Sequence, residues 1–571
     1  MAGQRISVLQ RARMQREMRK ESRTGKMRNS MRQTEQRMKT RWILVFLAML
    51  VCFCGWWAVR KEGFFADELY SYGLSNSNYA PFLSWYYNGE RAYSGTSAEH
   101  IYSREDFMSY VAVQEGQRFD YASVYYNQTQ DVHPPVFYFL LHTVCSLFPG
   151  SFTKWTGLGL NFALFGGTIA ALYALGMEIF EGENSWKKSL FVCALYAFSG
   201  EAISNATMIR MYMLLTLFTT VLALLLAKAL RRPTLVRYLL IGIVIYLGML
   251  TQYFYVIYAF LLCAVYDFYL MLRREWKHVV QFSAAALAGV GGMMLTFPCW
   301  LAQLHSQSTV SLDTTTDNIL NLSQYPKGPL ELTGWSIVEF GVGAGIMALL
   351  LLVALTKRFL PGKLRQTVLI APRAKLITIP ALAAFIVIAV ISPYKSLRYV
   401  YHLQPLEALF CGCGFFAVLD TLGQNARKKI TQAVCALMLV LAFVLTPERM
   451  YIGNRKVNEE LEQYSDAQCV SLIGDMTAFT SELPEYLHFK EICAVQDTSS
   501  TLLREYCTGE SDSMVVFICG RGLWQFVTPG EVEQITQENQ ASAEEIARLG
   551  GYTSVEMLDT QEFSQIWVLK K

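Results

Sequence analysis

The sequence carries little charge for its length. Asp, Glu, Lys and Arg make up 17% of the 571 residues, whereas hydrophobic residues make up 53%. A soluble chain of ordinary composition is charged at about a quarter of its residues. The shortage of charge, together with long apolar runs, argues against a soluble globular protein and predicts a polytopic membrane protein.

Other signatures are missing as well. No CxxC pair or Cys/His spacing suggests a metal site, and nine of the thirteen Cys lie before residue 447, mostly in apolar runs. Cys in such runs is usually a small core residue. No small-residue cleavage site follows the first apolar stretch, 42–59, so we expect a retained signal anchor. No phosphate-binding glycine motif occurs in the C-terminal tail, whose four Cys permit disulfides without showing them.

The charge that is present is divided unevenly along the chain. Residues 1–41 carry thirteen Lys/Arg against three Glu, whereas residues 447–571 carry nine Lys/Arg against twenty-one Asp/Glu. A basic start, an apolar middle and an acidic end are typical of a membrane protein and do not suggest nucleic-acid binding. We therefore predict a basic cytoplasmic segment over 1–41, a membrane domain over 42–446 and a further domain over 447–571.

About eleven transmembrane helices are predicted, because a bilayer core needs roughly 20 apolar residues as helix. They lie near 42–59, 156–179, 187–203, 209–230, 237–252, 254–272, 279–300, 335–356, 375–393, 401–420 and 430–446. If the N-terminus is cytoplasmic, the connections after every second span lie inside, and each of these carries Lys or Arg. Counting the short apolar segment 136–148 as a span would invert this pattern, so we expect an interfacial or re-entrant helix there.

Three segments should then lie outside the cytoplasm: 60–155, 301–334 and 447–571. The first, which we call the first outer loop, is rich in Tyr and Trp, which suit the headgroup level of a membrane. The tail alternates short β-like runs with helical stretches, which predicts a small extracytoplasmic α/β domain. Its strands are expected at Cys469–Ile473, Glu491–Val495, Met514–Cys519 and Phe563–Leu569, and its helices around Thr477–Leu487 and Val532–Leu549.

Several ionisable residues fall at the predicted outer ends of the spans. Asp67 and Glu68 follow the first span closely. Partial burial and like charge there would both raise the pKa of a carboxylate, which suits a general base. The alternative is a solvated acidic pair just outside the bilayer. Asp131 and His133 stand at the start of the apolar segment, before two prolines that favour a helix start. A polar helix cap would explain them equally well.

Three basic residues complete this set. Arg210 opens the fourth span, against the positive-inside bias, although a snorkelling Arg would look the same. Lys395 and Arg398 lie in the predicted outer connection between spans nine and ten, where cations are natural ligands for a lipid phosphate. Transfer of a sugar from a lipid phosphate needs a base for the acceptor hydroxyl and cations for the departing phosphate.

Four motifs in this order resemble the GT-C glycosyltransferases of the protein O-mannosyltransferase and aminoarabinose-transferase type. They are Asp67-Glu68, His133-Pro134-Pro135, Arg210-Met211-Tyr212 and Arg398-Tyr399. The similarity covers about residues 40–445, and all four motifs fall on the predicted outer face. The resemblance implies a GT-C-like membrane fold and transfer of a sugar from a polyprenyl-phosphate carrier to a hydroxyl of a protein, lipid or cell-envelope glycan.

The resemblance also implies roles for particular residues. Asp67, with Glu68 beside it, would act as base or orient the acceptor, and Lys395, Arg398 and Tyr399 would bind the carrier phosphate together with Arg210. Asp131, His133 and Tyr212 would support the site. Many relatives carry a Glu two residues before the Arg of the Arg-x-Tyr motif, but this chain has Met208 there and its nearest acidic residue is Glu201. That departure leaves a divalent metal open, and no other cofactor is expected.

Two other functions compete with this interpretation. A secondary transporter would place charges near the middle of its spans, where this sequence has almost none; His402 and Glu407 are exceptions. A membrane anchor that displays the tail as a binding module would give Asp67 and His133 no purpose. The sugar and the acceptor are not specified by the sequence.

Overall fold

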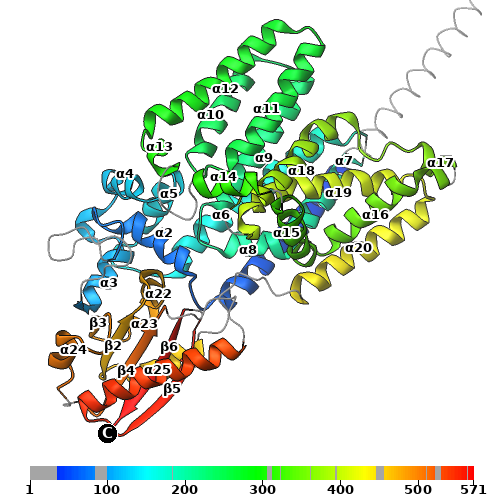
Figure 1. The fold of residues 1–571 in the computed structure, drawn as a ribbon. Helices are drawn as coiled ribbons and strands as arrows, with labels where there is room; N and C mark the ends of the chain where they lie inside the picture. Colours follow the sequence, from blue (N-terminus) through cyan, green and yellow to red (C-terminus); the bar gives the residue numbers. More distant parts are fainter. Residues whose placement is uncertain are drawn as a thin grey trace, which may run out of the picture. The chain divides into compact units, whose positions relative to one another are not determined.

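The computed structural model describes residues 35–83, 99–182, 184–304, 312–321, 323–360, 362–392, 395–444, 455–508, 511–520, 529–561 and 563–571. The chain forms two compact units, Met1–Gly55 and Trp56–Lys571. Most of the first apolar helix, Glu35–Arg60, belongs to the first unit. The other helices and strands belong to the second unit (Figure 1).

Helices coincide with the predicted spans. They are Glu35–Arg60, α6 (Lys154–Ile179), α7 (Ser185–Ala197), α8 (Gly200–Thr207), α9 (Tyr212–Arg231), α10 (Leu235–Met249), α11 (Tyr255–Leu272), α12 (Trp276–Thr296), α15 (Gln324–Phe340), α16 (Val342–Thr356), α18 (Pro372–Ile391), α19 (Gln404–Leu419) and α20 (Gln424–Val444). Short helices join them: α13 (Trp300–Leu304), α14 (Leu312–Leu320), α17 (Gly362–Gln366), η2 (Lys357–Phe359), η3 (Leu397–Tyr399) and η4 (Tyr401–Leu403). In the described chain, eight helices are long and apolar enough to cross a membrane. The multi-pass α-helical fold is confirmed, and the count of eleven stays a prediction.

Two predicted spans are interrupted. The span predicted at 187–203 ends as α7 at Ala197, and α8 starts anew because the Ser199 hydroxyl caps its first turn. The span predicted at 335–356 is divided at Gly341, whose φ of 56° lies in the left-handed region that favours glycine. Such breaks are invisible to a hydropathy pattern because the flanking residues stay apolar.

The first outer loop contains α2 (Ala66–Asn76), β1 (His100–Ser103), α3 (Arg104–Val111), η1 (Glu115–Gln117), α4 (Tyr121–Gln130) and α5 (Val136–Cys145). Helix α5 is ten residues long, which is too short to span and agrees with the prediction for 136–148. Helices α2 and α3 pack closely, since a Cβ on Gly73 would lie 2.0 Å from Cζ of Tyr110.

The tail folds as an α/β domain around one sheet. Its elements are α21 (Arg455–Glu462), β2 (Gln468–Ile473), α22 (Met476–Ser481), α23 (Leu483–Tyr486), β3 (Glu491–Val495), α24 (Thr501–Tyr506), β4 (Ser513–Cys519), α25 (Pro529–Gly550), β5 (Ser554–Thr560) and β6 (Ser564–Lys570). The strand order is β1-β3-β2-β4-β6-β5, with β2 parallel to both neighbours and β6 antiparallel to β4. The α/β domain is confirmed; β5 was not expected from the sequence. All four Cys of the tail are buried free thiols.

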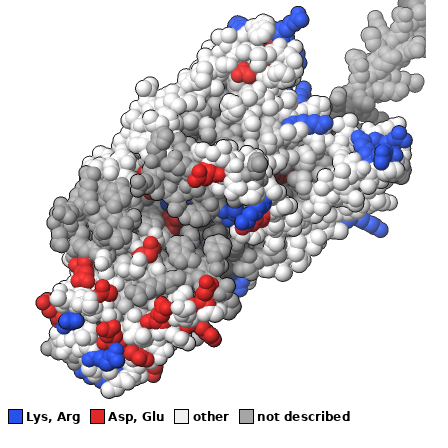
Figure 2. Space-filling view, viewed as in Figure 1, with Lys and Arg blue, Asp and Glu red and all other residues white. Residues whose placement is uncertain are grey.

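One strand of this sheet comes from the first outer loop. Strand β1 pairs antiparallel with β3, with Ile101 opposite Cys493. Beside it, Phe107 of α3 lies 5.3 Å between ring centroids from Tyr486 and 6.1 Å from Phe479, which cover one face of the sheet. Helix α25 covers the other face through Ala543, Ile546 and Ala547. The domain predicted over 447–571 therefore shares its sheet and its core with the first outer loop. Figure 2 shows Asp and Glu gathered over this domain, whereas the surface of the spans is mostly uncharged.

This shared core leads to a first prediction. Residues 447–571 expressed alone should lack a cooperative thermal transition, because the edge of β3 and the aromatic face lose β1 and α3. The same segment fused through a flexible linker to residues 99–113 should show one. Circular dichroism melting of the two proteins makes the comparison. Equal melting temperatures would show that the tail folds without the first outer loop.

Candidate functional site

Asp67 meets two arginines from distant parts of the chain. It lies in the first turn of α2, which begins as the chain leaves the first apolar helix. Its Oδ2 accepts a hydrogen bond from Nη1 of Arg398 and lies 3.9 Å from Nε of Arg210. The Asp67 side chain is 23% exposed, whereas Arg210 is 5% exposed. The structure thus brings three predicted site residues together, and Asp67 and Arg398 are both partly accessible, with Arg398 15% exposed.

Arg210 is held by groups that the sequence did not single out. Its Nη1 donates to the Tyr138 hydroxyl at 3.1 Å and to Ser71 Oγ at 3.3 Å. Tyr138 is fully buried and lies one turn into α5, after the paired prolines. A residue three positions beyond Pro135 shares its side of a helix, so the motif spacing was a signal for Tyr138. The surrounding dipoles fix the guanidinium next to Asp67.

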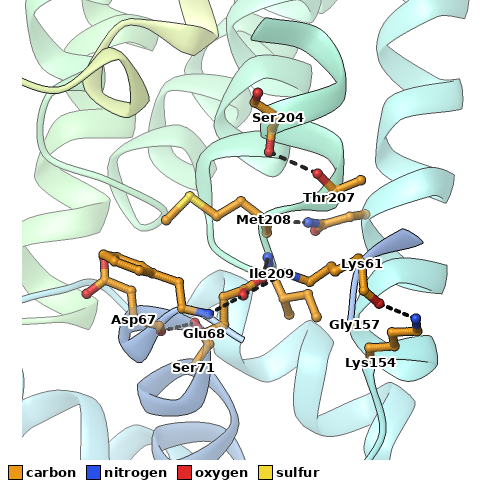
Figure 3. A network of polar contacts seen from close by, with 12 residues as sticks. Lys61, Asp67, Glu68, Ser71, Lys154, Gly157, Ser204, Thr207, Met208 and Ile209 are labelled. Atoms are coloured by element: carbon orange, nitrogen blue, oxygen red, sulfur yellow. Dashed lines mark hydrogen bonds and ion pairs between the residues drawn. The ribbon is translucent and has the colours of Figure 1, made fainter. Parts of the chain in front are cut away.

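Glu68 is enclosed rather than open to a substrate. Its Oε2 accepts from Lys61 Nζ at 2.8 Å and from the Phe65 amide at 2.7 Å, and its Oε1 accepts from the Ile209 amide at 2.7 Å. The side chains of Glu68 and Lys61 are both 0% exposed. Figure 3 shows Glu68 reaching across to Ile209 and Lys61. We therefore regard Glu68 as a positioning residue that ties α2 to the chain just before Arg210, and not as a second catalytic carboxylate.

Asp131 and His133 form a pair at the start of α5. His133 Nδ1 lies 2.9 Å from Asp131 Oδ2, and the two side chains are 17% and 14% exposed. Burial alone would raise the pKa of Asp131, but the neighbouring His133 and the Arg210 cation outweigh it and leave that pKa below its ordinary value. Asp131 is therefore an anion within electrostatic reach of Arg210, which fits its predicted supporting role.

The late connection supplies Arg398 with aromatic neighbours. The guanidinium carbon of Arg398 lies 5.7 Å from the Phe65 ring centroid and 5.4 Å from that of Tyr399. The Tyr399 ring in turn lies 6.4 Å from the ring of Tyr212. Tyr212 and Tyr399 are both buried, so their rings form the apolar wall beside the arginine.

Lys395 does not join Asp67. Its Nζ donates to the carbonyl of Val390, near the end of α18, at 3.1 Å. It also donates to the carbonyl of Ser392, the residue after α18, at 2.9 Å. Partial burial lowers its pKa, while the charge of Glu331 acts in the opposite direction. Lys395 thus caps α18 in this structure, and its predicted contact with a carrier phosphate remains a prediction.

Glu201 also lies apart from Asp67. Its Oε1 accepts from the Ser336 hydroxyl of α15, and its charge interacts with those of Glu407 and Glu339. Within the described ranges, no group of three or more His, Cys, Asp or Glu has an arrangement that could hold a metal ion. Among the described residues, Oδ2 of Asp67 faces the guanidinium groups of Arg398 and Arg210, so this carboxylate oxygen is not arranged as a ligand for a divalent cation.

The match to a family model covers part of this site. Residues 132–301 match the family described as dolichyl-phosphate-mannose-protein mannosyltransferase, a range that includes His133, Tyr138 and Arg210. The similarity to these mannosyltransferases extends over this segment, which is less than half of the chain. No curated protein matches the sequence of this chain.

Solved structures give distant similarities to this chain. ArnT from Cupriavidus metallidurans has TM-scores of 0.45 bound to undecaprenyl phosphate and 0.47 in the apo state, each at 12% identity over 93% of this chain and 98% of that one. AglB from Archaeoglobus fulgidus, in complex with an inhibitory peptide and a dolichol-phosphate, has a TM-score of 0.45 at 12% identity, over 91% of this chain and 73% of that one.

Proposed function

We propose that this protein transfers a sugar from a polyprenyl-phosphate carrier to a hydroxyl acceptor on the extracytoplasmic side of the membrane. The observation that carries the proposal is the partly exposed Asp67 carboxylate between the guanidinium groups of Arg398 and Arg210. A base beside fixed cations is the set that this chemistry needs. The family match over 132–301 supports the reaction class.

The reaction would proceed as one displacement. Asp67 accepts the proton of the acceptor hydroxyl. At the same time, the oxygen of that hydroxyl attacks the anomeric carbon of the sugar. The bond from that carbon to the phosphate oxygen breaks, and the carrier phosphate departs with the electron pair. Arg398 and Arg210 stabilise the negative charge that develops on this leaving group.

The ion pair between Arg398 and Asp67 would serve as a resting state. While Arg398 donates to Asp67, the guanidinium keeps the carboxylate ionised and weakly basic. The carrier phosphate offers two oxygens that can accept bidentate hydrogen bonds from Arg398. Its arrival would draw Arg398 away from Asp67 and so make the carboxylate more basic at the moment when the acceptor hydroxyl needs a base.

The direct test is sugar release from radiolabelled polyprenyl-phosphate-hexose by the purified full-length protein in detergent. Turnover with a donor of this class would establish the reaction, and the products would identify the transferred sugar. No turnover with any common carrier sugar would overturn the proposed function. It would favour a secondary transporter or a membrane anchor that displays the tail as a binding module.

Arg398→Ala gives the second prediction. Because Arg398 is proposed to bind the carrier phosphate, the variant should raise the donor KM by roughly 10- to 100-fold, the equivalent of the roughly 1.5–3 kcal/mol of a charge-assisted hydrogen bond. The acceptor KM should change little. Arg118→Ala is the control, because Arg118 lies in the first outer loop and donates to the carbonyl of Ser146 instead of to Asp67. Equal losses for donor and acceptor would argue against phosphate recognition by Arg398.

A further inference from the structure

Two further cations lie near α2, outside the site described above. Arg60 is the last residue of the first apolar helix, and Lys154 is the first residue of α6. The Tyr72 hydroxyl of α2 donates to the carbonyl of Thr153 at 2.8 Å, so the start of α6 adjoins the helix that carries Asp67. In the predicted topology this is the non-cytoplasmic end of the spans, where Lys and Arg are disfavoured. Their presence there calls for a partner.

Lys154 is held beside the backbone of Arg60. Its ammonium group donates to the Val59 carbonyl at 3.4 Å and to the Lys61 carbonyl, which belong to the residues on either side of Arg60. These bonds use two of the three donors of an ammonium group. Arg60 is exposed, and its guanidinium carbon lies 4.0 Å from the centroid of the Trp56 ring. Stacking on a ring face leaves the in-plane N–H groups of Arg available for hydrogen bonds.

Exposed apolar side chains belong to the same two segments. In the first helix Trp56 is 45% exposed and Val59 is 66% exposed, and Trp155 at the start of α6 is 53% exposed. The Lys154 ammonium lies 5.1 Å from the centroid of the Trp155 ring. Trp side chains at the ends of apolar helices are typical of the headgroup level of a membrane. This combination indicates that both cations lie at the depth of the lipid phosphates.

The charge of this region suits an anionic lipid. Lys61 forms a fully buried ion pair with Glu68, so its charge is neutralised within the protein. Arg60 and Lys154 are then opposed by Glu62, which leaves a net positive charge. An anionic phospholipid such as phosphatidylglycerol carries a net negative charge, whereas zwitterionic phosphatidylcholine carries none. Charge complementarity therefore favours the anionic lipid.

Hydrogen bonds connect this region to α2. Figure 3 shows Lys154 reaching the backbone of Lys61. The Lys61 side chain donates to Glu68 at 2.8 Å, and Glu68 accepts from the Ile209 amide at 2.7 Å. A lipid that holds Lys154 in place would therefore support the first turn of α2, which carries Asp67.

We propose that Arg60 and Lys154 bind the phosphate of an anionic phospholipid at the end of the first apolar helix and the start of α6. Trp56 and Trp155 would lie against the glycerol and the upper part of the acyl chains. This site is separate from the carrier-phosphate site proposed at Arg398, and the inference does not depend on sugar transfer.

Native mass spectrometry of the full-length protein in neutral detergent tests this site by titration with dioleoyl-phosphatidylglycerol or dioleoyl-phosphatidylcholine. The wild type should bind the phosphatidylglycerol more tightly. Arg60→Gln and Lys154→Gln should each weaken that binding about fivefold, because one Lys or Arg near an anionic lipid contributes about that factor. Binding of phosphatidylcholine should not change. Lys187→Gln is the matched control, since Lys187 lies 5.3 Å from the Trp186 ring near the start of α7, which follows the far end of α6.

Three outcomes would overturn the proposal. The first is equal affinity of the wild type for the two phospholipids, and the second is a loss in Lys187→Gln as large as that in Arg60→Gln. The third comes from a parallel titration with a polyprenyl phosphate: tighter binding of this lipid, weakened by the same two substitutions, would assign the cations to the carrier. Arg60→Gln keeps the test decisive even if Lys154→Gln fails to fold, because the Arg60 side chain is exposed.

Discussion

Replacement of Asp67 with Asn is expected to abolish sugar transfer while the protein remains inserted and folded. The amide keeps the shape of the side chain and can still accept a hydrogen bond from Arg398 through its oxygen, but it cannot take a proton from an acceptor hydroxyl. General-base catalysis contributes about 10²–10⁴-fold, so the rate should fall at least 100-fold. Sugar release in detergent, wild type beside variant, is the measurement.

A matched control separates catalysis from the loss of an ion pair. Asp420 also lies between two cations, with Lys188 Nζ at 2.9 Å and Arg427 Nη1 at 2.8 Å. Asp420→Asn therefore removes the same charge from a similar setting away from α2, and we expect its turnover to match the wild type. Near-normal transfer by Asp67→Asn would remove Asp67 from the role of base. A similar loss in both variants would point to stability instead.

The sequence was informative about the centre of the site because motifs marked its residues. Asp67, Arg210 and Arg398 were singled out for their place at span ends, and they meet although 331 positions separate Asp67 from Arg398. The alternation of the spans predicts which helix ends lie on the same side of the membrane. Residues at those ends are therefore candidates for one shared site. The order of the four motifs along the chain then carried the resemblance to GT-C enzymes.

The remaining contacts depend on packing that a single sequence does not encode in a simple pattern. Lys61 lies just after the first predicted span in the sequence, yet it is fully buried against Glu68. Strand β1 is four residues long and pairs with a strand almost 400 positions away. Such a short segment has no alternation of apolar and polar residues long enough to predict a strand. Asp67 and Glu68 are adjacent in the sequence but make different contacts. Asp67 faces the arginines, whereas Glu68 accepts a hydrogen bond from the backbone amide of Ile209.

Lys61→Met is expected to be the most destabilising single change in this region. The substitution leaves the Glu68 carboxylate buried without its cation, and breaking a buried pair in this way costs about 3–5 kcal/mol. The double variant Lys61→Met/Glu68→Gln should recover part of that loss, because the Gln side-chain oxygen can still accept from Ile209 or Phe65 without a buried charge. Thermal unfolding of the purified proteins in detergent gives the comparison.

Burial, rather than the presence of an ion pair, is the cause that this comparison isolates. Lys490 and Asp466 also approach to 2.8 Å, but their side chains are 83% and 87% exposed. Solvent screens such a pair, so Lys490→Met should leave the unfolding temperature unchanged. If Lys61→Met were equally harmless, Glu68 would not be an essential tie between α2 and the chain before Arg210. If the double variant were worse than Lys61→Met, the two residues would stabilise the site through separate contacts and not as one buried pair.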